Sequence, residues 1–198
     1  MKPSKSIPAP AAVPRAAERI RQSASELFYQ QGIRAIGVDE IVSHAGVTKP
    51  SLYRAYPSKD ELAAACLRDY DAAFWQRFEG TGEHADDPRA QLLAYLGGLT
   101  QRATKTGYRG CGLTNAAVEY PEAEHPARKV AQSSKRALRT RLVAMAERMG
   151  ASDPQELGDG LLLLIEGTFA SGQLFGKGGP ARSLVAIAER LIDASIEG

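Results

Sequence analysis

The segment of residues 32–62 most constrains the fold, because it reads as two short helices joined by a tight turn. An apolar stripe within residues 38–42 recurs at the spacing of one helical face. Gly46 then interrupts the pattern with a residue that can take a positive φ angle. Thr48 can cap the next helix, and Pro50 fits its first turn, where no backbone N–H is needed. The segment therefore predicts a helix-turn-helix.

The second helix of this segment carries side chains that suit DNA. A short helix that presents hydroxyls, cations and phenols fits the major groove and its flanking phosphates. The candidate DNA-binding residues are Thr48, Lys49, Pro50, Ser51, Tyr53, Arg54, Tyr56 and Lys59. The alternative is an αα-hairpin that only packs against its neighbours, since this geometry also occurs in proteins that do not bind DNA. The clustering of these side chains on so short a segment favours DNA binding.

Charge is distributed unevenly along the chain. Residues 1–60 hold nine Lys or Arg against five Asp or Glu, whereas the remaining 138 residues hold sixteen against eighteen. A basic N-terminal third suits a phosphate-binding module. Residues 1–14 contain four prolines, two lysines and no acid, and they predict a disordered basic arm. This arm is either a solvated tail or a further contact to the minor groove or the DNA backbone.

The residues from about Arg15 to Leu62 resemble the DNA-binding domain of the TetR/AcrR family of transcriptional regulators. The resemblance is carried by Ile41, Ala45-Gly46-Val47, Leu52-Tyr53, Tyr56 and Ser58-Lys59-Asp60-Glu61-Leu62. One position departs from the family pattern: Gly37 stands where Ser or Thr is common, so the hydroxyl that would contact a phosphate is missing there.

The resemblance assigns roles to the candidate DNA-binding residues. Thr48, Lys49 and Ser51 lie at the start of the second motif helix, where base edges are reached. Tyr53 and Lys59 are expected at phosphates, which fix register without reading sequence. A double-stranded DNA operator is thus the expected partner.

The rest of the chain predicts an all-α fold with about nine helices, because apolar residues recur at helical spacing and no alternating strand pattern occurs. Besides the two motif helices, the expected helices are about 14–31, 58–79, 88–106, 113–120, 126–149, 153–175 and 181–196. We expect three parts: the arm, 1–14; a helix-turn-helix DNA-binding domain, 15–60; and an effector-binding and dimerisation domain, 61–198.

The last two helices are the candidate dimer interface. The run from Leu161 to Ile165 is apolar around a whole helical turn, and such a helix is either central to a fold or buried by a second chain. Small residues on the same helix, Gly167, Ala170, Ser171 and Gly172, allow another helix to approach closely. TetR-like proteins dimerise through a four-helix bundle of these elements, so the resemblance implies a homodimer. The alternative is a monomeric bundle.

The resemblance also implies a small-molecule effector that binds within the larger domain. The candidate pocket residues are Phe74, Phe78, Tyr95, Leu99, Cys111, Asn115, Glu119, Glu166 and Phe169. Each aromatic or aliphatic member could instead belong to the core. Glu166 is either paired with a structural cation or a polar anchor for the ligand, because an acid among apolar residues needs a partner. Cys111 is either a packed thiol or a redox-sensitive one.

Several classes of function lack support in this sequence. It contains no nucleotide-binding or hydrolase motif, no metal-ligand spacing and no residue set that implies a cofactor, so we expect a protein that is not an enzyme. We also expect no signal peptide and no membrane span. Cys66 and Cys111 form no redox spacing, which fits a reducing cytoplasm.

We interpret the chain as a ligand-responsive transcriptional regulator. Repression, the majority behaviour of the family, would involve a dimer on a pseudo-palindromic operator that a small-molecule effector releases. The alternative is a helical small-molecule-binding or adaptor protein without DNA binding.

Overall fold

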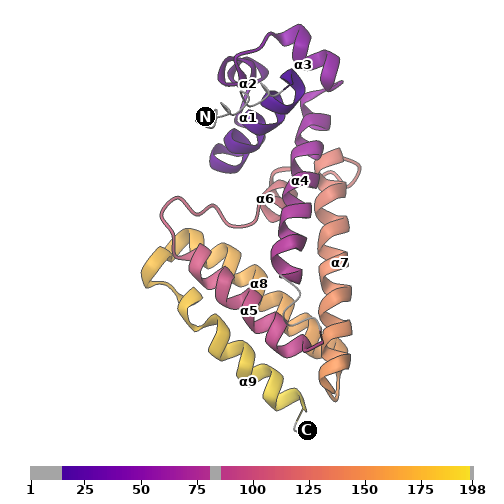
Figure 1. The fold of residues 1–198 in the computed structure, drawn as a ribbon, viewed down its shortest axis with the longest axis vertical. Helices are drawn as coiled ribbons and strands as arrows, with labels where there is room; N and C mark the ends of the chain where they lie inside the picture. Colours follow the sequence, from indigo (N-terminus) through magenta and orange to yellow (C-terminus); the bar gives the residue numbers. More distant parts are fainter. Residues whose placement is uncertain (1–14, 81–85, 197–198) are drawn as a thin grey trace, which may run out of the picture.

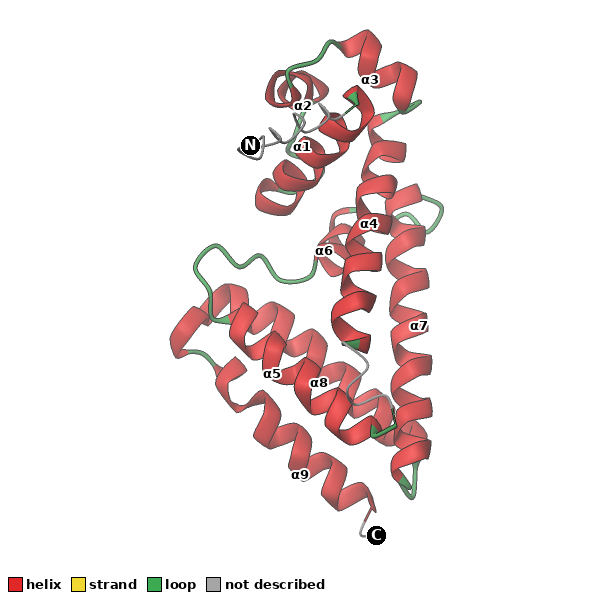
Figure 2. Cartoon of the chain, in the orientation of Figure 1, coloured by secondary structure: helices red, strands yellow, loops and turns green. Residues whose placement is uncertain are grey.

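The computed structural model describes residues 15–80 and 86–196, and the arm predicted at residues 1–14 lies outside them. The described residues form an all-α fold, as expected (Figures 1 and 2). Its helices are α1 (Ala16–Gln31), α2 (Val38–Ala45), α3 (Lys49–Ala55), α4 (Lys59–Glu79), α5 (Pro88–Ala103), α6 (Gly112–Glu119), α7 (Pro126–Met149), α8 (Pro154–Phe175) and α9 (Leu184–Ile196). Two short 3-10 turns, η1 (Gly176–Gly178) and η2 (Pro180–Ser183), join α8 to α9.

The helices are arranged as a small unit on a larger body. Helices α1, α2 and α3 pack together at one end of the molecule, and α4 runs from them into the larger body, where it lies beside α7 (Figure 1). Helices α5, α8 and α9 form a layered group at the other end. Because α4 belongs to both parts, it is the main covalent and packing link between them.

Local signals in the sequence explain where the helices begin and end. Gly46 ends α2 in the left-handed conformation, with φ 61°, and turns the chain into α3. The Ser58 hydroxyl accepts a hydrogen bond from the backbone N–H of Glu61 at 3.1 Å, which caps α4. Asp153 caps α8 in the same way through the N–H groups of Gln155 and Glu156.

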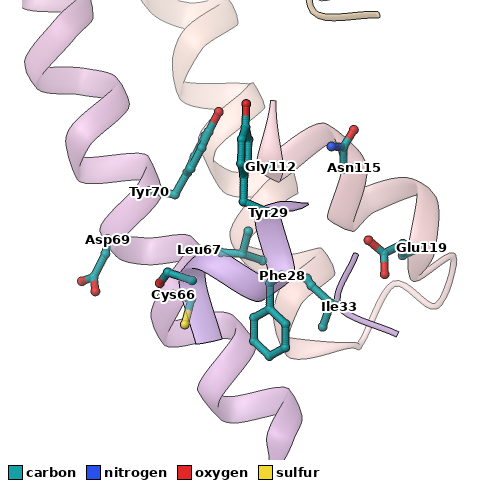
Figure 3. A pocket seen from close by; sticks show the side chains of 11 residues that line it. Phe28, Tyr29, Ile33, Cys66, Leu67, Asp69, Tyr70, Gly112, Asn115 and Glu119 are labelled. Carbon is teal, nitrogen blue, oxygen red and sulfur yellow. The ribbon is translucent and has the colours of Figure 1, made fainter. Parts of the chain in front are cut away.

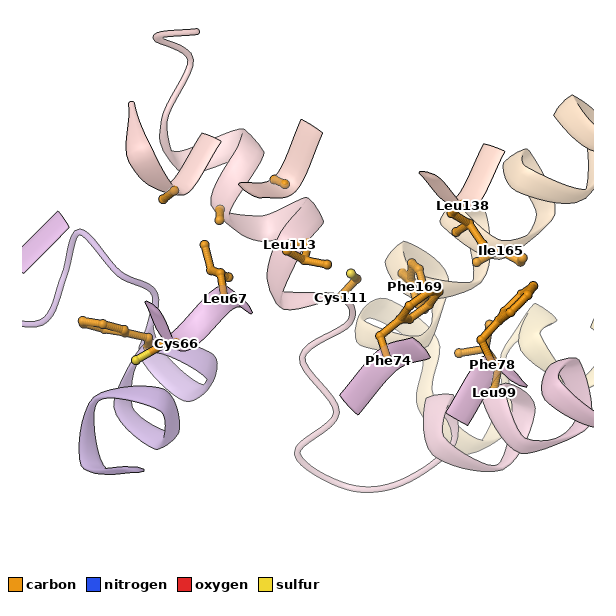
Figure 4. Packing of buried hydrophobic residues seen from close by; sticks show 14 of the residues in the cluster. Cys66, Leu67, Phe74, Phe78, Leu99, Cys111, Leu113, Leu138, Ile165 and Phe169 are labelled. Carbon is orange, nitrogen blue, oxygen red and sulfur yellow. The ribbon is translucent and has the colours of Figure 1, made fainter. Parts of the chain in front are cut away.

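An aromatic cluster forms the centre of the larger body. Phe74 and Phe78 of α4 are stacked with ring centroids 5.9 Å apart, and Tyr95 of α5 lies 4.9 Å from Phe78. Figure 4 shows Phe74 and Phe78 facing Phe169 and Ile165 of α8, across the body from Cys66 and Leu67 at the other end of α4. This cluster fixes α4 against α5 and α8.

Helix α8 is central on one side and exposed on the other. Leu161 and Ile165 are fully buried, whereas Leu163 is 72% and Leu174 is 78% exposed. Gly172, expected to allow close approach of another helix, is buried within the chain, and a Cβ there would lie 2.8 Å from the Tyr108 ring. Within the described ranges, none of the helices combines the length and apolar character needed to cross a membrane.

Candidate DNA-binding surface and effector cavities

Helix α3 presents nearly all of its side chains to solvent. Leu52 is fully buried and anchors the helix to α1 and α2, but Tyr53 is 51% exposed. The other predicted contact residues at the start and along the outer face are also exposed: Thr48, Lys49, Pro50 and Arg54. Ser51 is half-buried, and its hydroxyl lies 3.1 Å from that of Thr48. The helix is thus one-sided, with its polar face turned outward.

Lys49 forms an ion pair at this surface. Its Nζ lies 2.8 Å from Oδ1 of Asp39, at the start of α2. The hydrogen bond that Lys49 donates to Asp39, together with the negative charge of Asp39, raises the pKa of Lys49, so the ammonium is charged at neutral pH. Because both side chains are exposed, water and salt screen this pair strongly, and a phosphate or a base edge can compete with Asp39.

Two predicted contact residues also have structural partners. The Lys59 ammonium donates hydrogen bonds to the carbonyl oxygens of Ile33 at 2.8 Å and Ile36 at 2.9 Å, which ties α4 to the loop between α1 and α2. The Tyr56 hydroxyl donates to the carbonyl of Ala17 at 3.4 Å. Both side chains are half-buried. Their roles in DNA binding stay predictions, while their roles in holding the three-helix unit together are visible.

Five of the nine candidate effector residues line one of two cavities, whereas Phe78, Leu99, Cys111 and Glu166 line neither. The first, of about 240 Å³, lies where α1, α4 and α6 meet and includes Asn115 and Glu119 (Figure 3). The second, of about 360 Å³, includes Phe74, Tyr95 and Phe169. Tyr29 and Tyr70 line both cavities; their rings are stacked with centroids 6.3 Å apart.

Two other candidates belong to the core. Phe78 and Leu99 are 1% exposed and line neither cavity. Phe78 packs against Phe74 and Tyr95, so it supports the wall of the second cavity from behind. Phe78 and Leu99 therefore belong to the core, which was the alternative stated for the aromatic and aliphatic candidates.

Glu166 has structural partners, as one of its two interpretations expected. Its Oε1 lies 2.6 Å from Lys135 Nζ, and its Oε2 accepts a hydrogen bond from the Thr114 hydroxyl at 2.8 Å. The same ammonium lies 3.3 Å from Cys111 Sγ and 4.9 Å from the centroid of the Phe169 ring. Cys111 is buried beside this cation, a neighbour in α7 that its local sequence did not reveal.

Glu119 joins the larger body to the small unit. Its Oε2 accepts a hydrogen bond from the backbone N–H of Arg34 at 2.8 Å, and its carbonyl accepts one from the Arg34 guanidinium at 3.1 Å. The guanidinium also lies 5.8 Å from the centroid of the Tyr120 ring. Gly32 permits this approach, because a Cβ there would lie 3.2 Å from Glu119 Oε1. We call this set of contacts the Glu119–Arg34 clasp.

Comparison with known proteins gives the family. Residues 20–66 match the model of bacterial regulatory proteins of the tetR family. Over the whole fold, a crystal structure from Streptomyces avermitilis described as a TetR transcriptional regulator is 32% identical, with a TM-score of 0.83; the match covers 92% of this chain and 98% of that one. The chain belongs to the TetR family. It is a helix-turn-helix transcriptional regulator rather than an enzyme.

Other TetR-family relatives are similar over different lengths. A TetR-family regulator from Streptomyces coelicolor is 26% identical with a TM-score of 0.78, and the match covers 92% of this chain and 94% of that one. The transcriptional activator FasR of Mycolicibacterium smegmatis is 50% identical over 46 residues, which are 23% of this chain and 21% of FasR. The curated relatives LmrA and BdcR are likewise matched over 43% and 28% of their lengths.

The TetR-family fold shows which residues the sequence alone did not single out. Tyr29, Arg77, Arg102 and Tyr108 all line the second cavity. Tyr29 lies in α1, outside the expected effector domain, and its hydroxyl accepts a hydrogen bond from the Arg109 N–H at 3.1 Å. In the sequence, Tyr29 could be noticed as a polar residue beside the buried stripe of α1. Its partner could not be identified, because Arg109 is 80 positions away.

Proposed function

We propose that this protein is a dimeric TetR-family repressor that binds a pseudo-palindromic operator and is released by a small molecule. The outward polar face of α3 carries the proposal: Lys49, Tyr53 and Arg54 are exposed on the basic unit, while Leu52 holds the helix in place. Such a helix can enter the major groove with its N-terminal residues at base edges. Thr48, Lys49 and Ser51 would read bases, and Tyr53 would bind phosphate.

Lys59 can take part without leaving its structural position. Two of its three N–H groups are directed at the carbonyls of Ile33 and Ile36. The third remains available to a phosphate oxygen at the edge of the groove. In this proposal Lys59 contributes by fixing the small unit and adds one positive charge to its DNA-facing side.

The proposed dimer uses the exposed faces of α8 and α9. On α8, Leu163, Gly167, Ala170 and Leu174 are exposed and follow one another at intervals of four, three and four residues, so they share one face. Ile187 adds an exposed apolar side chain from α9. Small residues between the leucines allow a second copy to approach closely. A two-fold dimer would present two α3 helices to half-sites roughly 34–36 Å apart.

The proposed release is a shift between two arrangements of the dimer. In one, the α3 helices fit the half-site spacing; in the other, favoured by a small molecule in the larger body, they do not. The ligand can shift this equilibrium only by its differential affinity, typically about 1–3 kcal/mol of coupling. The two cysteines within the described ranges are unpaired, which supports action in the reducing cytoplasm.

DNA binding is tested by fluorescence anisotropy with the DNA that flanks the protein's own gene. Arg54→Ala should weaken binding by roughly tenfold or more, as expected for loss of a charge-assisted contact. Arg136→Ala is the matched control, because Arg136 is exposed on α7, away from α3. Tyr53→Ala should weaken operator and random DNA alike. Equal, measurable binding by wild type and Arg54→Ala would contradict the proposed role of Arg54. No binding by wild type would favour the adaptor alternative.

The salt dependence of binding gives a second readout. The logarithm of the association constant should fall with the logarithm of salt concentration by roughly 0.9 for each phosphate contacted. A flat response would contradict the proposed use of the basic unit. Repression is tested separately with a reporter gene behind the same DNA, where removal of the regulator should raise transcription. Lowered transcription would indicate an activator.

The dimer is tested by analytical ultracentrifugation of the full chain. Leu163→Glu places a charge in the middle of the proposed interface and should yield monomers. Val118→Glu is the control, since Val118 is 79% exposed on α6, away from that face. Wild-type monomers, or an intact Leu163→Glu dimer, would contradict the arrangement.

A further inference from the structure

The second cavity is lined by cations and aromatic rings. Arg77, Arg102 and Lys105 contribute positive charges, and no carboxylate occurs among the described residues that line it. The first cavity differs, because Asp69 and Glu119 line it. Charge complementarity therefore favours an anion in the second cavity and disfavours one in the first.

Tyr95 supplies a buried donor in the same place. Its side chain is 4% exposed, and its hydroxyl has no hydrogen-bond partner among the residues that the structure describes. Burial raises the pKa of Tyr95, so the phenol keeps its proton at neutral pH and can only donate or accept as a neutral group. A buried hydroxyl without a partner is destabilising, and a ligand that accepts a hydrogen bond from it would relieve that cost.

Arg102 lies close to this phenol. Its guanidinium carbon is 5.6 Å from the centroid of the Tyr95 ring. A cation and a neutral donor thus face one cavity from α5, a combination that suits a carboxylate. The lining also includes the aromatic rings of Phe74 and Phe169, which suit a flat ring. The volume of about 360 Å³ is within the range of roughly 300–1,000 Å³ found for small-molecule sites.

We propose that the second cavity is the effector site and that it binds a small aromatic carboxylate, which Arg102 and Tyr95 recognise. This inference rests on the proposed function, because it names the chemistry of the effector. The carboxylate pairs with the Arg102 guanidinium and accepts a hydrogen bond from the Tyr95 hydroxyl, while the ring lies against Phe74 and Phe169.

The position of the cavity explains how the small unit would sense the acid. Tyr29 of α1 lines the cavity, and its hydroxyl is hydrogen bonded to the backbone of the loop before α6, through the Arg109 N–H and the Gly110 carbonyl. Figure 3 shows the Tyr29 and Tyr70 rings standing side by side at the edge of the first cavity. An acid in the second cavity therefore touches a residue of the DNA-binding unit directly.

The test is isothermal titration of the full-length protein with three probes of similar shape and different charge. The probes are 2-naphthoate, the neutral 2-naphthamide and the cationic 2-naphthylmethylammonium, with benzoate as a smaller acid. We expect 2-naphthoate to bind at least roughly tenfold more tightly than the amide, since a charge-assisted hydrogen bond is lost in the amide. The ammonium probe should bind most weakly.

Two variants locate the site. Arg102→Gln removes the cation and should weaken 2-naphthoate binding by roughly tenfold to one-hundredfold. Tyr95→Phe removes only the unpartnered hydroxyl, so it should weaken acid binding without lowering thermal stability. Arg136→Gln and Tyr120→Phe are the matched controls, because neither residue lines the cavity. Circular dichroism confirms that each variant is folded.

Each outcome decides the proposal. Acid binding that both cavity variants weaken and both controls preserve supports it. Amide or ammonium binding as tight as that of the acid overturns the assigned charge, and equal acid binding by all variants overturns the assigned cavity. Failure of both acids to bind at up to about 1 mM overturns the ligand class. DNA binding, measured on the same samples without acid, shows separately whether the regulator itself functions as proposed.

Discussion

The Glu119–Arg34 clasp should contribute measurably to the attachment of the DNA-binding unit. Glu119 is the last residue of α6, where the helix dipole disfavours a carboxylate. Its hydrogen bond to the Arg34 N–H, at 2.8 Å, opposes that cost. A hydrogen bond to a charged group contributes about 1.5–3 kcal/mol, and a carboxylate at a helix C-terminus costs about 0.3–1 kcal/mol. Because Arg34 is exposed, we expect Glu119→Ala to lose about 1–2 kcal/mol.

Two assays measure this loss at a fixed protein concentration. In a protein of this length, 1 kcal/mol corresponds to a shift of about 2–4 °C, so the melting temperature of Glu119→Ala should fall by about 2–8 °C. Hydrogen exchange followed by mass spectrometry should show faster exchange in the peptide that contains Arg34, whose amide loses its acceptor. Peptides from α8 should exchange as in wild type, because the clasp lies far from them.

The controls separate the clasp from a general effect of charge. Glu122→Ala removes a nearby exposed carboxylate and should leave both measurements unchanged. Glu119→Gln retains an acceptor without charge and should give an intermediate result. If Glu119→Ala has the melting temperature of wild type and the peptide that contains Arg34 exchanges as slowly as in wild type, the reasoning is refuted. The clasp would then not hold the two parts together.

Three further predictions concern single side chains. Lys135→Met leaves the Glu166 carboxylate half-buried without its cation and should cost about 1–3 kcal/mol in chemical denaturation; adding Glu166→Leu should recover part of it. Burial raises the pKa of the Cys66 thiol to about 11, whereas the unfolded thiol titrates near pH 9.0, so stability should fall as pH rises through this interval. Cys66→Ala should make that fall shallower by about 1.4 kcal/mol per pH unit. Lys49→Ala should change operator preference; equal losses on every DNA sequence would refute its reading role.

The helices could be predicted because residues close to each end determine where the helix begins or stops. Ser58, Pro126 and Asp153 each mark the start of a helix, and the structure begins or caps helices at those positions. The last helix begins at Leu184 rather than Ala181, because Pro180–Ser183 form a 3-10 turn first. Proline fixes its own φ angle but does not determine whether the next turn is 3-10 or α, so this boundary depended on tertiary packing.

The outer face of α3 could also be predicted, since one short helix carries both the buried Leu52 and its exposed polar residues. The cavities could not, because they are built from residues far apart in the chain. Glu119 meets Arg34 across 85 positions, and Thr114 meets Glu166 across 52. Helical periodicity shows which residues share a face of a helix, but it does not show what that face contacts. The sequence therefore left two interpretations of Glu166, and the structure identified its partner as Lys135.

Within the described ranges, the small unit is hydrogen bonded to α6 and to the loop before it at two places, and these contacts limit how the effector could influence DNA binding. One is the Glu119–Arg34 clasp; the other is Tyr29, hydrogen bonded to the loop at Arg109 and Gly110. A ligand acts only through contacts that differ between the two arrangements. Each neutral hydrogen bond contributes about 0.5–1.5 kcal/mol, so loss of the two at Tyr29 would supply about 1–3 kcal/mol, the usual size of allosteric coupling. Because the clasp would remain closed, α1 would pivot about it rather than separate from the body. A pivot near one end of α1 changes the direction of α3, and in a two-fold dimer that change is applied to both half-sites at once.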